Sequence, residues 1–152
     1  MWNALGMGFE GFCLAMTGKA LDAVSKLASG ISGLRSAGAT VTLPLFLSLL
    51  ARSHADLGHF DEACRAIKEA INAIEKTKEK WYEAEVLRIA GEVALKSPLP
   101  NVAKAQTYFE RAVSVARQQQ AKSWELRAAM SMARLWRDQG KPQQARELLA
   151  PV

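Results

Sequence analysis

Cysteine, proline and long apolar runs are scarce in this 152-residue chain. Its two cysteines, Cys13 and Cys64, form no CxxC pair and stand among apolar or small residues, so we expect free thiols that pack as small hydrophobes. No run reaches the ~20 apolar residues that a membrane span needs. The start of the chain carries Glu10 and three glycines instead of the basic segment of a signal peptide. We therefore expect a cytoplasmic protein that does not enter a membrane.

Motifs for catalysis, cofactors and metals are missing as well. The chain has no phosphate-binding GKS/T loop, no HExxH and no serine or cysteine beside a recognisable base. The only histidines, His54 and His59, lack the one-turn spacing of a helical metal pair. Residues 6–11 match the dinucleotide-binding pattern G-x-G-x-x-G, but no strand precedes them. We interpret these glycines as small residues at a helix crossing. We expect no enzyme, no cofactor and no metal site.

The charge is only mildly one-sided. Lysine and arginine number 20 against 15 acidic residues, which gives a formal net charge of +5 spread along the chain. Such a balance permits an acidic partner without requiring one. No helix concentrates the basic residues into a stripe suited to a DNA groove, so we do not expect nucleic acid as a partner.

One short pattern occurs three times: a glycine ends an apolar stretch, and an alanine follows within the next stretch. The pairs are Gly18 and Ala23, Gly58 and Ala63, and Gly140 and Ala145. With Ala105 included, the alanines are separated by 40, 42 and 40 residues, and no segment shows a strand pattern. This period predicts an all-α fold, a right-handed superhelix (α-solenoid) of about four helical hairpins. We expect one repeat domain over residues 1–152, with units at about 2–36, 43–77, 80–119 and 123–150.

The glycines and alanines have separate roles in this hypothesis. Each glycine supplies a left-handed residue at a hairpin corner, whereas small residues let the two helices approach closely. Gly11 is expected opposite Leu27 and Gly30, and Gly91 opposite Phe109. Residues 97–101, with two prolines, replace the corner glycine in the third unit. Thr42 can cap the helix that begins the second unit.

Residues 47–71, which read LxxLAxxHxDLGHFxEAxxxIxxAI, resemble the tetratricopeptide repeat. The period of about 40 residues is similar to that of a longer variant in large bacterial regulators. Residues 81–95 and 123–152 resemble the C-terminal repeats of multidomain bacterial proteins that carry class III adenylate/guanylate cyclase or transcriptional-regulator domains with an ATPase module. This resemblance implies a non-catalytic scaffold or regulatory module that binds a protein or peptide.

In such a fold the first helix of each hairpin lines a concave groove. Counting around these helices from the small packing residues selects a mixed but arginine-rich set: Arg52, Asp56, Glu85, Arg88, Glu92, Arg127, Met130, Arg134 and Arg137. Guanidinium groups suit carboxylates, so we expect a peptide with acidic groups. The alternative is a solvated face with local pairs, such as Arg88 with Glu92 and Arg134 with Asp138.

Both ends of the array are apolar. Trp2, Leu5 and Phe9 belong to a first helix with no repeat before it, and the last helix has no polar capping helix after it. We expect either a fragment of a longer protein or an end-to-end or swapped homodimer that covers these faces. The alternative function is therefore an assembly element that forms oligomers through its terminal helices.

Overall fold

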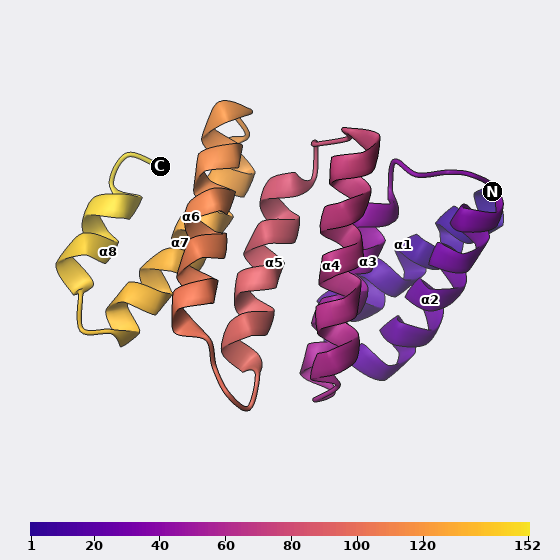
Figure 1. Cartoon of the computed structure of the whole chain (residues 1–152), viewed down its shortest axis with the longest axis horizontal. Helices are drawn as coiled ribbons and strands as arrows, with labels where there is room; N and C mark the ends of the chain where they lie inside the picture. The colour runs from indigo at the N-terminus through magenta and orange to yellow at the C-terminus, as the bar shows by residue number, and fades with distance from the viewer. The chain divides into compact units, whose positions relative to one another are not determined.

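The computed structural model describes residues 1–152 as eight α-helices without a strand (Figure 1). This confirms the all-α prediction. The helices are α1 (Trp2–Met16), α2 (Ala20–Ser36), α3 (Leu43–Asp56), α4 (Phe60–Thr77), α5 (Glu83–Lys96), α6 (Val102–Gln118), α7 (Lys122–Asp138) and α8 (Pro142–Leu149). Only α5 begins clearly later than predicted, after a turn at Trp81 and Tyr82. None of the helices has both the length and the apolar character needed to cross a membrane.

The chain forms two compact units, Met1–Tyr82 and Glu83–Val152. In the first unit α1 packs on α2 and α3 on α4, while α3 also contacts α2 and α1. The second unit repeats this arrangement: α5 packs on α6 and α7 on α8, while α7 also contacts α6 and α5. In both units, therefore, the first helix of the second hairpin packs on both helices of the first hairpin.

The corner glycines have the predicted left-handed conformation. Their φ angles are +79° at Gly18, +80° at Gly58 and +75° at Gly140. After α3, the Gly58 amide donates to the Ala55 carbonyl at 3.1 Å, and the His59 amide donates to the His54 carbonyl at 2.8 Å. These bonds satisfy the last carbonyls of the helix while the chain turns back. The glycines are thus needed for a backbone conformation that side chains disfavour.

The third corner reaches the same result with different residues. The side chain of Asn101 accepts a hydrogen bond from the Lys104 amide at 2.9 Å and so caps α6. Its own amide donates to the Ala94 carbonyl at the end of α5, at 3.1 Å. The prediction for Thr42 is wrong, because its side chain makes no capping bond to α3. There Pro44, in the first turn, fixes a helical φ angle instead.

Small residues allow close helix crossings. A Cβ atom at Gly91 would lie 2.4 Å from the Phe109 ring, and one at Gly11 would lie 2.7 Å from the Leu27 side chain. Both predicted contacts are confirmed. Gly30 differs from the prediction, since a Cβ there would meet the backbone of Ala4 and Gly8 and not Gly11. The crossing lies one helical turn earlier on α1 because Leu27 already fills the space at Gly11.

The two cysteines are free, but both are exposed. The expectation that they pack as small hydrophobes is therefore wrong. Each lies next to a buried or half-buried position on its helix, so the apolar neighbours in sequence point to the core while the thiol points outward.

Candidate functional site

A cleft of about 310 Å³ opens on the α7–α8 hairpin. Its apolar lining comes from Met130, Ala133, Pro142, Ala145 and Leu149. Met130 and Leu149 are 38% and 36% exposed. The hairpin therefore presents a partly open apolar surface on the side that no other helix covers.

Three arginines complete the lining of this cleft: Arg134 and Arg137 from α7, and Arg146 from α8. Arg137 pairs with Asp138, whose Oδ1 lies 3.0 Å from the guanidinium Nη2, and both side chains are largely exposed. The sequence-based alternative that Arg134 pairs with Asp138 is therefore wrong. Arg134 and Arg146 contact no carboxylate, and none lines the cleft. The site combines apolar surface with uncompensated positive charge.

A buried ion-pair network joins α5 to α7 in the second unit. Glu85 and Arg88 are only 3% and 5% exposed. The Arg88 guanidinium donates to both carboxylate oxygens of Glu85, at 2.7 and 2.8 Å. Arg127 of α7 donates to the same two oxygens, at 2.7 and 3.2 Å. Arg88 also pairs with Glu92, which confirms the local pair expected from their spacing.

The electrostatics of this network hold both buried groups in their charged forms. Burial by itself would raise the pKa of Glu85, but the hydrogen bonds and charges of Arg88 and Arg127 lower it below its ordinary value. Burial would likewise lower the pKa of Arg88, but Glu85 and Glu92 raise it. The network fixes α7 against α5 and leaves no free charge inside the unit.

The residues predicted for the groove therefore divide by exposure. Those with exposed side chains are Asp56, Met130, Arg134 and Arg137. Arg52, Glu92 and Arg127 are half-buried, whereas Glu85 and Arg88 are buried. Arg52 and Asp56 belong to the first unit, and the other members belong to the second. Within the second unit, Met130, Arg134 and Arg137 lie on one face of α7 and reach the same cleft.

Sequence reasoning missed Arg146 and Leu149 as members of this site. Arg146 directly follows the repeated alanine Ala145, and Leu149 lies one turn later, so both fall on the second helix of the hairpin. Only first helices were considered for the groove. The signal that could have found them is the position of Leu149, which corresponds to that of buried Phe109 but carries a smaller side chain.

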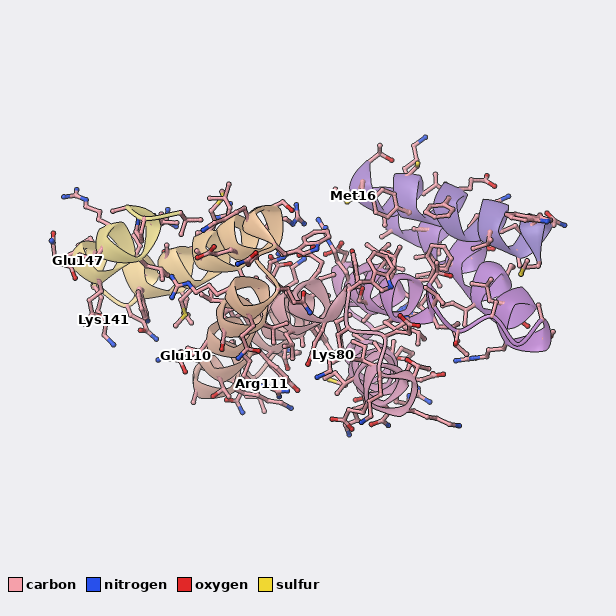
Figure 2. The ribbon with its side chains drawn as sticks, turned by 90° about the horizontal axis from the view of Figure 1, so that it is seen from above. Met16, Lys80, Glu110, Arg111, Lys141 and Glu147 are labelled. Carbon is pink, nitrogen blue, oxygen red and sulfur yellow. The ribbon has the colours of Figure 1, made fainter.

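The predicted oligomer contact lies at the start of the first unit. Trp2 is 79% exposed and Phe9 is 49% exposed, while Leu5 is half-buried. The ring of Phe9 also packs edge-on against Phe46, with centroids 5.4 Å apart. Figure 2 shows Met16, a further exposed apolar residue, at the other end of α1.

The two histidines form a separate pair with no acidic or thiol group completing a metal-binding cluster. Their ring centroids are 5.8 Å apart, and the Nδ1 atom of His54 is buried without a hydrogen bond. Burial, followed by the nearby charge of His59, lowers the pKa of His54 below its ordinary value.

Two stacked hairpins in each unit define a class of protein, the helical-hairpin repeat proteins. Within this class, the family model for the tetratricopeptide repeat matches residues 44–69 and 126–151. These segments cover α3 with the first half of α4, and α7 with α8, so the match supports tetratricopeptide repeats at two of the four hairpins. Such repeats generally mediate protein–protein interactions and are typically non-catalytic. No curated protein matches the chain significantly.

Proposed function

We propose that this chain is a non-catalytic regulatory or scaffold module that binds a protein or peptide through an arginine-rich groove. The observation that carries the proposal is the exposed face of α7, where Met130, Arg134 and Arg137 border an apolar cleft without a carboxylate. An unpaired guanidinium group offers several donors in a planar fork, which suits a carboxylate ligand. The ligand that fits best is a peptide with acidic side chains beside apolar ones.

The buried network supports a rigid binding face. Arg127 of α7 pairs with buried Glu85 of α5, and the Ser131 hydroxyl of α7 lies 3.4 Å from Glu92 of α5. Rotation of α7 would break both of these contacts. Arg134 and Arg137, one and two turns beyond Ser131, are thus presented from a fixed helix. Side chains positioned in advance lose less entropy when a ligand binds.

The similarity of residues 81–95 and 123–152 to C-terminal repeats of bacterial regulators supports a place in a larger signalling or regulatory protein. In that setting the module would couple partner binding to an adenylate cyclase or transcriptional output. The gene and its neighbours test this directly, since an adjacent output domain would name the regulated activity.

Reversing the charge of Arg134 and Arg137 to glutamate is expected to weaken binding of a labelled glutamate-rich peptide that contains proline and therefore stays extended. In fluorescence anisotropy titrations we expect the affinity to fall about tenfold or more, because two attractions become repulsions. The matched control reverses Lys104 and Arg111 on α6, which are both exposed; Figure 2 shows Arg111. Equal binding by the wild type and the Arg134/Arg137 variant would reject the groove.

The alternative function is assembly of a homodimer through α1. It is favoured by the large exposed side chains of Trp2 and Phe9, which lie about two turns apart on α1. If assembly is the function, sedimentation should show a dimer that the variant Trp2→Glu/Phe9→Ser converts to a monomer. A wild-type chain that stays monomeric at high concentration would rule this alternative out.

A further inference from the structure

The second unit contains an internal example of how a helix covers a hairpin of this protein. On the α5–α6 hairpin, α7 places Met132 and Leu135 in one buried cluster with Ala105 and Phe109. Beside this apolar contact, Arg127 of α7 reaches Glu85 of α5, and the Ser131 hydroxyl lies 3.4 Å from Glu92. A hairpin of this chain is therefore covered by an apolar ridge with a polar row next to it.

The α7–α8 hairpin repeats the positions of the α5–α6 hairpin. On the first helices, residues 42 apart correspond, so Glu85 corresponds to Arg127 and Glu92 to Arg134. On the second helices, residues 40 apart correspond, so Ala105 corresponds to Ala145 and Phe109 to Leu149. The apolar part of the surface is thus retained, and it is the floor of the open cleft.

The charged part of the surface is reversed. Where α5 offers the carboxylates of Glu85 and Glu92, α7 offers the guanidinium groups of Arg127 and Arg134. Arg127 is already held by Glu85, but Arg134 is unpaired, and Arg146 adds a second unpaired charge at the cleft. A helix in this position therefore needs an acidic residue where α7 itself carries Ser131, and it must not place a positive charge where α7 carries Arg127.

We propose that the α7–α8 cleft receives one amphipathic helix of a protein partner, which seats as α7 does on α5–α6 and directs a carboxylate at Arg134. The inference rests on the proposed binding function and specifies its ligand as helical, with an apolar ridge flanked by acidic side chains. Helix-in-groove recognition of this kind reads apolar anchors at i, i+3, i+4 and i+7, and charge complementarity selects the partner.

The probe for this proposal is a labelled peptide with the sequence of residues 122–138 in which Arg127 and Ser131 are both replaced by glutamate. The unmodified sequence serves as the control peptide. With the full chain, we expect the acidic peptide to bind at least about tenfold more tightly than the control peptide. Arg146→Glu and Leu149→Glu in the protein should each weaken binding of the acidic peptide, whereas Arg111→Glu on α6 should not.

A charge swap makes the register testable. Arg134→Glu should lose the acidic peptide and gain a peptide that carries Ser131→Arg more than one that carries the same added charge elsewhere, and this dependence on position is what a general electrostatic attraction does not predict. Equal binding of acidic and control peptides, or binding unaffected by Arg134→Glu, would overturn the proposal; the latter would mean that the peptide replaces α7 itself. Self-association abolished by Arg134→Glu would assign the cleft to a second copy. If a longer protein from the same gene shields the cleft residues from solvent, the occupant of the cleft is a further helix of the same polypeptide.

The two proposals fail separately. If the extended acidic peptide binds in a manner that depends on Arg137 while the helical probe does not bind, the groove function stands and the helical ligand is rejected. Binding of both ligands by the wild type, and loss of both in the Arg134/Arg137 variant, is the result expected if both proposals hold. Leu149→Glu should weaken binding of both ligands, because Leu149 lines the cleft that both proposals use.

Discussion

Replacing Arg88 with methionine is expected to lower the free energy of unfolding by about 3 kcal/mol, the lower end of the cost of breaking a buried ion pair. Methionine fills much of the same space, but Glu85 would stay buried with Arg127 as its only cationic partner. The magnitude stays at the lower end because Arg127 still neutralises the carboxylate. Urea denaturation followed by circular dichroism measures the loss.

The matched control is Arg134→Met on α7. Arg134 is exposed and makes no ion pair, so this variant should stay within about 0.5 kcal/mol of the wild type. The same substitution is thus expected to have unequal effects on two helices of one unit. Similar stabilities for Arg88→Met and Arg134→Met would show that the network does not hold α5 to α7.

The same network gives the acid stability of the chain a definite direction. Because the pKa of folded Glu85 lies below its ordinary value of 4.5, its contribution to stability is fully present above that value. It is lost as the pH falls through the folded pKa. Stability of the wild type should therefore decline more steeply below pH 4.5 than that of Glu85→Gln, which has no carboxyl group to protonate there. Parallel declines would mean that Glu85 is not held as a carboxylate.

Replacing Gly30 with alanine is expected to destabilise the first unit by about 1–3 kcal/mol, although alanine is the better helix former. Its Cβ would lie 2.7 Å from the Gly8 amide nitrogen and 2.9 Å from the Ala4 carbonyl oxygen. These are backbone atoms of α1, so the two helices would have to move apart. Chemical denaturation of the purified variant measures the effect.

Gly6→Ala is the matched control for Gly30→Ala and is expected to change stability in the opposite direction. Gly6 lies within α1, and a Cβ there would meet no atom within 4 Å. Only the helix propensity changes, which should stabilise the chain by up to about 1 kcal/mol. If Gly30→Ala were also stabilising, α1 and α2 would not cross as closely as described.

Much of the fold could be predicted because its signals are local. The φ angles at Gly18, Gly58 and Gly140 follow from the need to end a helix and reverse the chain. The pair of Arg88 with Glu92 likewise follows from positions one turn apart on a helix. The prediction that Thr42 caps its helix was wrong because a helix can begin without a side-chain cap. Here Pro44 in the first turn already has a helical φ angle.

The candidate site could be predicted only in part. Helical spacing placed Met130, Arg134 and Arg137 on one face of α7, and they do share one cleft. The same spacing grouped them with Glu85 and Arg88, which are buried. Their exposure differs because the ion-pair partner of a charged residue lies on a neighbouring helix. The position of a residue along its own helix does not reveal which side chains the neighbouring helix places against it.

By itself, the amino-acid sequence determined the helices, their corners and the small residues at which they cross, because each depends on backbone conformation or on periodicity along one segment. Only the tertiary structure decided which charged side chains form ion pairs. The carboxylate of Glu85 pairs with Arg127, 42 residues away, because α7 packs on α5 in one register. That packing is set by the shapes of several side chains at once, and it leaves Arg134 and Arg146 at the cleft without a carboxylate beside them.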